Sequence, residues 1–77
     1  MSKFVTFRDA YGMEVIVVFP KYVQHADFAS NFQHWKPIRA GFVSKDLQCH
    51  GESISLRLMA DAKLDTQLLK ESLESRR

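Results

Sequence analysis

The segment 3–19 reads KFVTFRDAYGMEVIVVF and contains two apolar runs separated by a short polar stretch. Residues 4–7 and 13–19 are rich in β-branched and aromatic side chains, which favour β-strands. The residues between them, DAYG at 9–12, are typical of a turn. The segment therefore predicts two strands joined as a hairpin.

A three-residue loop ending at Gly12 sets the register of this hairpin. With Gly12 in the left-handed conformation, Arg8 falls opposite Glu14 and Phe7 falls opposite Val15. This register pairs opposite charges at the loop end of the hairpin and keeps one apolar set of side chains on one face. Two independent constraints agree, so we expect an antiparallel pair in this register.

The rest of the chain continues with a helix, two strands and a second helix. Proline in the first turn and an apolar stripe at helical spacing indicate the first helix, which should end before Pro37. The expected elements are a helix at 20–33, strands at 38–44 and 52–58, and a helix capped by Asp61 that ends near Glu74. The acidic and basic side chains of this last helix balance, and we interpret them as a solvated outer face.

The element order ββαββα predicts a single α+β domain over residues 1–77. The economical arrangement is a two-layer sandwich, with a four-stranded, mainly antiparallel sheet and both helices on one face. When the sequence is aligned with itself at an offset of 39 residues, Gly12 matches Gly51 and the expected strands that follow them are aligned. This match is consistent with duplication of a ββα unit, and equally with the generic pattern of a turn glycine before an alternating strand.

Composition limits the classes of function. The chain has 77 residues, 45% hydrophobic and 26% charged, with a net charge of +2, which describes one small domain with a small core. The apolar run 15–19 is too short to cross a bilayer, so no membrane association is expected. The single cysteine, Cys49, cannot form an intrachain disulfide and fits a reducing compartment. We expect a cytoplasmic protein.

The sheet face turned away from the helices should be polar, but an apolar patch interrupts it. By strand parity the patch consists of Phe4, Ile16, Val18 and Val43. Three explanations of such a patch stay open: the C-terminal tail or a curled strand covers it, a partner covers it, or it is only a set of scattered exposed hydrophobic residues that the fold tolerates. Because a small domain gains stability by burying such a face, we predict a homodimer or a protein partner there. The leading hypothesis is a non-enzymatic interaction module.

A nucleic-acid-binding accessory protein is the alternative. Residues 28–45 contain no acidic side chain, and cations alternate there with aromatic side chains. Aromatic stacking combined with phosphate contacts suits single-stranded nucleic acid. The candidate binding residues are Trp35, Lys36, Arg39 and Lys45.

Catalytic and metal-binding motifs are not evident. His25 and His34 are nine residues apart, and the adjacent Cys49 and His50 do not form a paired ligand motif. A loop thiol without an orienting third group predicts ordinary, slow alkylation. We therefore predict no catalytic residue, no metal and no cofactor, and an activity based on Cys49 ranks third among the hypotheses.

Four short strings carry a resemblance. They are EVIVVFP at 14–20, HADFA at 25–29, AGFV at 40–43 and CHGES at 49–53. Together they resemble small uncharacterised proteins encoded in bacterial and prophage genomes. The resemblance implies a bacterial cytoplasmic setting and an accessory role, and it carries over no site residue.

Overall fold

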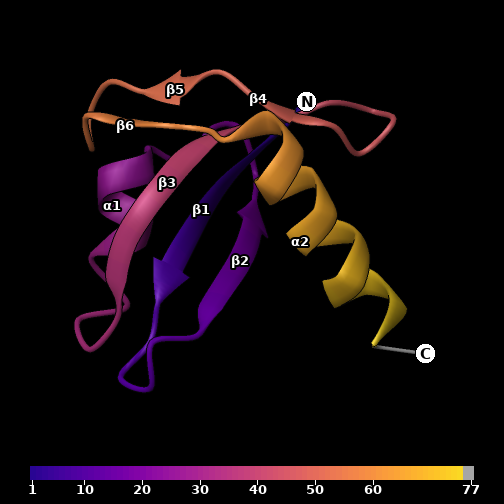
Figure 1. The fold of residues 1–77 in the computed structure, drawn as a ribbon. Helices are drawn as coiled ribbons and strands as arrows, with labels where there is room; N and C mark the ends of the chain where they lie inside the picture. The colour runs from indigo at the N-terminus through magenta and orange to yellow at the C-terminus, as the bar shows by residue number, and fades with distance from the viewer. Residues whose placement is uncertain (76–77) are drawn as a thin grey trace.

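The computed structural model describes residues 1–75, and it has the α+β class predicted from the sequence (Figure 1). Its elements are β1 (Ser2–Arg8), β2 (Glu14–Phe19), α1 (His25–Ala29), β3 (Lys36–Val43), β4 (Cys49–His50), β5 (Glu52–Ser53), β6 (Leu58–Met59) and α2 (Ala62–Glu74). The main sheet has the order β2-β1-β3-β4 with antiparallel pairs throughout, and β5 and β6 form a separate two-stranded ribbon.

The β1–β2 hairpin has the register expected from the sequence. Arg8 lies opposite Glu14 and Phe7 opposite Val15, and Gly12 has a φ of 80°. The N–H of Asp9 donates to the Met13 carbonyl at 2.9 Å, which closes the loop. Local turn chemistry and strand parity were sufficient to predict this part of the fold.

The two helices lie on opposite faces of the sheet, so the expectation of both helices on one face is wrong. Val5 and Phe7 belong to a core cluster that includes side chains of α1, whereas Phe4 and Ile16 pack with Leu69 of α2. Figure 1 shows α1 and α2 on either side of the strands. The physical reason is that β1 and β2 are apolar at both parities, so each face needs a cover to exclude water.

The first helix is shorter than the expected span 20–33. The chain first makes a turn in which the Val23 N–H donates to the Pro20 carbonyl at 3.2 Å, and the α-helix covers only His25–Ala29. Tighter turns follow, including a 3.0 Å bond from the Phe32 N–H to the Ala29 carbonyl. These turns keep the aromatic side chains packed on the sheet without a continuous helix.

The expected strand over 52–58 is wrong, because this segment folds back on itself as the β5–β6 ribbon. The Ser53 hydroxyl accepts the Leu56 N–H at 3.2 Å, Arg57 has a φ of 57°, and Ile54 is 86% exposed. Gly51, with a φ of 81°, turns the chain out of the main sheet before this ribbon. The fourth sheet position is filled by β4, so the halves of the chain differ where a duplication would make them alike.

The last helix has the expected bounds and cap but not the expected outer face. The Leu64 N–H donates to the Asp61 carboxylate at 3.0 Å. Asp65 is fully buried, although we expected it to be solvated: its carboxylate accepts bonds from the Thr6 hydroxyl at 2.8 Å and from Arg39 Nε at 2.9 Å. The strands beneath α2 supply polar partners for this carboxylate, and they fix the helix to the sheet.

Candidate functional site

Three of the four residues expected in an exposed interface are buried within the chain. Phe4, Ile16 and Val43 pack beneath α2, and Val18 alone remains substantially open, with 42% of its surface exposed. The expectation of an open apolar sheet face is therefore wrong. A C-terminal segment covers that face, which was one of the alternatives drawn from the sequence.

The four residues expected to bind nucleic acid are not gathered on one surface. Trp35 packs against Phe7 and Phe32, with ring centroids 5.8 and 5.6 Å away. Arg39 forms ion pairs with Glu14 and Asp65 on the α2 face and is only 16% exposed. Lys36 and Lys45 are exposed, but they lie near opposite ends of β3.

The Cys49 thiol is buried, with 2% of the residue exposed. Burial raises the pKa of Cys49 to about 11, despite an opposing hydrogen bond with Thr66. The thiol is therefore neutral near pH 7, which disfavours nucleophilic chemistry because the thiolate is the reactive form. Within residues 1–75, no group of three His, Cys, Asp or Glu side chains is placed to hold a metal ion.

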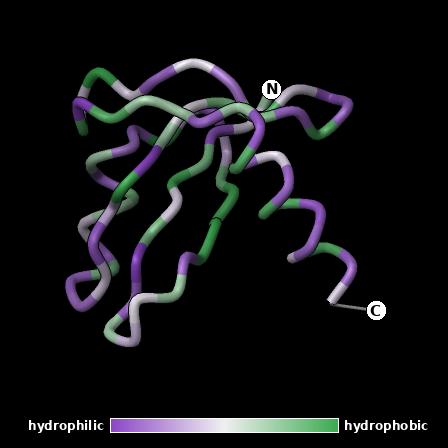
Figure 2. The backbone as a smooth tube through the Cα atoms, in the orientation of Figure 1, coloured by the Kyte–Doolittle hydropathy of each residue, from purple (hydrophilic) through white to green (hydrophobic). Residues whose placement is uncertain are grey.

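One open surface lies along the outer edge of β2. This strand pairs only with β1 in the sheet order, and Figure 2 shows most of it as a hydrophobic stretch. Each residue of an antiparallel strand directs its N–H and its C=O to the same edge of the strand, and successive residues alternate between the two edges. The Met13 carbonyl accepts the bond from the Asp9 N–H, so Met13 and every second residue after it face β1. The N–H and C=O of Ile16 and Val18 therefore point toward the open edge.

A groove runs between this edge and α2. It consists of three adjoining hollows of about 340, 330 and 130 Å³. The smallest hollow shares Val18, Leu69 and Leu73 with the first, and Ile16 and Ser72 with the second. We call this feature the edge groove. It combines unpaired strand backbone with an apolar wall, which are the two elements needed to receive an added strand.

Exposed apolar side chains gather at one end of the edge groove. Four of the side chains that line the hollow there are between 41% and 62% exposed: Met1, Val18, Leu47 and Leu73. Leu47 has a φ of 62°, an uncommon conformation for a leucine, in the turn after β3. The sequence pattern identified only Val18, because strand order and the path of α2 decide where the others meet.

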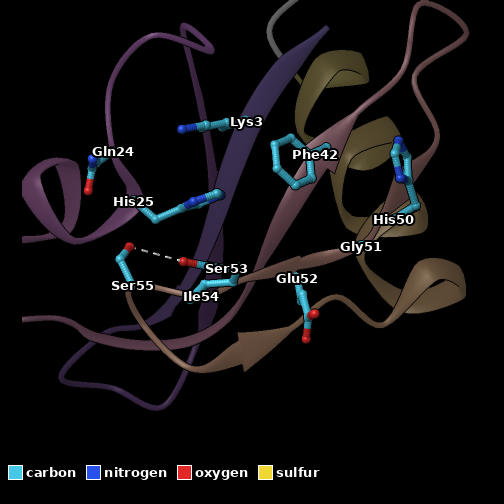
Figure 3. A pocket seen from close by; sticks show the side chains of 10 residues that line it. All are labelled: Lys3, Gln24, His25, Phe42, His50, Gly51, Glu52, Ser53, Ile54 and Ser55. Carbon is cyan, nitrogen blue, oxygen red and sulfur yellow. Dashed lines mark hydrogen bonds between the residues drawn. The ribbon is translucent and has the colours of Figure 1, made fainter.

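A separate hollow of about 660 Å³ lies on the α1 face of the sheet, away from the edge groove (Figure 3). Lys3, Phe42 and His50 face one another across β1, β3 and β4 in direct register, so they form one row on the same side of the sheet. In Figure 3, Lys3 and His25 lie on one side of the Phe42 ring and His50 on the other. We call this feature the row pocket.

His25 forms the back of the row pocket and is 4% exposed. Its Nε2–H donates to the Gly41 carbonyl at 2.8 Å, and its ring meets Phe19 and Phe42 edge-on. Burial lowers the pKa of His25, the Gly41 bond opposes that shift, and the nearby charge of Lys3 lowers it further. The ring is therefore neutral near pH 7, with Nδ1 as an acceptor.

Comparison with protein-family models, with curated proteins and with solved structures finds no match. In residues 1–75 there is also no helix that is both long enough and apolar enough to pass through a membrane. The edge groove and the row pocket are therefore the two features of the described residues that bear on function.

Proposed function

We propose that this chain is a non-enzymatic protein-interaction module that self-associates by pairing the β2 edges of two copies. The observation that carries the proposal is an apolar strand at an open sheet edge, bordered by the edge groove. Natural proteins protect open edges with charges, prolines or bulges, because an open edge pairs readily with another strand. Between Val15 and Phe19 the strand contains none of the charged or proline residues that give such protection.

The backbone of β2 is self-complementary. A two-fold axis perpendicular to the sheet at Val17 places Ile16 opposite Val18 of the second copy, and the reverse. Both residues direct their N–H and C=O outward, so each of these two pairs can exchange hydrogen bonds. The result is a continuous antiparallel sheet across both copies.

Side chains and charges at the groove support a second copy as the occupant. A strand added there must be apolar on both faces, because Ile16 and Val18 border it on one face and Val15 and Val17 on the other. The strand β2 itself meets this condition. Glu71 lines one end of the groove, where Glu14 is already paired with Arg39. Lys45 lines the other end, so an antiparallel copy brings an acidic side chain to a basic one.

A proline substitution at one outward position of β2 tests the proposal. Val18→Pro removes only an N–H that faces the open edge, where proline is tolerated, so the monomer should keep its β1–β2 ladder. The matched variant Val18→Thr keeps the N–H and the branched shape. Analytical ultracentrifugation should give twice the 8.9 kDa chain mass for the natural chain and for Val18→Thr, and the single mass for Val18→Pro.

Circular dichroism and a thermal melt of each variant show whether the fold is retained. A natural chain that stays monomeric at all concentrations would overturn the proposal. A folded Val18→Pro variant that remains dimeric would also overturn pairing through this edge, and it would place the contact on another surface.

A further inference from the structure

The row pocket has the features of a small-molecule site, independently of the β2 edge. Pockets for small ligands occupy about 300 to 1,000 Å³ and combine apolar walls with a few placed polar groups. The row pocket, at about 660 Å³, lies within that range. It takes an aromatic wall from Phe42 and polar groups from Lys3, His25 and His50.

The ring of Phe42 is kept accessible by the glycine beside it. A Cβ added to Gly51 would lie 3.0 Å from Cδ2 of Phe42, so any side chain there would press on the ring. Phe42 itself is half-buried, which leaves part of its surface open to the pocket. An aromatic ring with an accessible face favours offset or edge-on contact with another aromatic ring.

The charge of Lys3 is available to a ligand. Its ammonium donates to the Val23 carbonyl at 2.9 Å, which positions the group and leaves two N–H donors. Among the described residues, no carboxylate forms an ion pair with Lys3. Glu52 also lines the pocket, and Figure 3 shows its side chain pointing away from Phe42. Its negative charge disfavours a ligand that carries a further negative charge at the rim of the pocket.

We propose that the row pocket binds a small planar aromatic acid that carries one carboxylate. The aromatic ring lies against Phe42, between His25 and His50, and the carboxylate accepts hydrogen bonds from Lys3. The neutral ring of His25 provides an acceptor for a donor group on the ligand. This site is on the α1 face, so its occupancy does not require the β2 edge to be free.

An NMR titration with 2-naphthoate tests the site, with two matched probes. The 2-naphthamide probe keeps the rings and removes the charge, and decahydronaphthalene-2-carboxylate keeps the charge and removes the planar rings. We expect 2-naphthoate to shift the amide signals of Gly41, Phe42 and Gly51. Each matched probe should bind at least about tenfold more weakly, because it lacks one of the two contacts.

Substitutions of two different lysines provide the test variant and its matched control. Lys3→Met should weaken 2-naphthoate binding about tenfold, whereas Lys21→Met, which removes an exposed charge elsewhere, should leave it unchanged. Three results would overturn the proposal: no shifts at the row pocket, equal binding of 2-naphthoate and 2-naphthamide, or equal effects of the two lysine variants. The probe comparison on the natural chain decides the question even if Lys3→Met does not fold.

Discussion

Replacing Asp65 with alanine should remove a large part of the stability of this domain. The carboxylate is fully buried and accepts three hydrogen bonds: from the Thr6 hydroxyl at 2.8 Å, from Arg39 Nε at 2.9 Å and from the Asp61 N–H at 2.9 Å. Glu14 would remain as the acidic partner of Arg39. The Asp65→Ala substitution therefore does more than create a cavity, because it leaves three donors without their acceptor.

The size of the loss follows from these contacts. Breaking a buried ion pair by removing one partner costs about 3 to 5 kcal/mol, and each buried donor left without an acceptor costs about 1 to 3 kcal/mol. Because Arg39 keeps Glu14 and is 16% exposed, we expect a total loss of about 3 to 5 kcal/mol rather than the full sum. A domain of 77 residues has a free energy of unfolding of about 4 to 12 kcal/mol, so the variant loses a large part of it.

Urea unfolding followed by tryptophan fluorescence measures this loss, because Trp35 packs in the core against Phe7. Thr6→Val removes one donor while Asp65 keeps its other partners, and it should cost only about 1 kcal/mol. Glu74→Ala, at an exposed position on the same helix, should leave the urea midpoint near that of the natural chain. A loss below about 1 kcal/mol for Asp65→Ala would refute the view that this carboxylate anchors α2.

Two further predictions concern buried titratable groups. Burial lowers the pKa of His25 below its usual 6.5, so the unfolded chain binds more protons than the folded chain as pH falls through 6.5, and stability should decrease there. His25→Phe should show a smaller decrease between pH 7.5 and 5.5 in urea midpoints, and equal decreases would contradict the assignment. The Cys49 thiol, with its pKa raised to about 11, should react slowly with iodoacetamide in the folded chain and rapidly in denaturant. Fast alkylation of the folded chain at neutral pH would contradict its burial.

The sequence was sufficient for the hairpin because the information there is local. A turn glycine, a pair of opposite charges and strand parity all concern residues within a few positions of one another, and they agree on one register. The N-cap at Asp61 was predictable for the same reason. These features depend on neighbours along the chain, and the structure has them as expected.

The placement of the helices was not predictable from parity alone. Parity separates Phe4 from Val5, but it does not say which helix covers which side, and both sides of β1 are apolar. The alternation of Ile54, Leu56 and Leu58 was misleading, because a two-stranded ribbon with a turn shows the same spacing over so few residues. Long-range packing decides between these arrangements, so the candidate surfaces emerged only from the structure.

The two ends of α2 are held by different kinds of contact, and this difference bears on the edge groove. Near its start, Asp65 binds Thr6 and Arg39, and the Thr66 hydroxyl accepts the Cys49 N–H at 2.9 Å. Toward its end the helix faces β2 through Leu69 and Leu73, whose apolar contacts have no directional requirement. The polar contacts therefore fix the position of the helix on the sheet, and the apolar contacts form the wall of the edge groove. Because α2 forms one wall of the edge groove, Asp65→Ala, which weakens the anchor of that helix, should reduce the proposed pairing of β2 edges as well as stability.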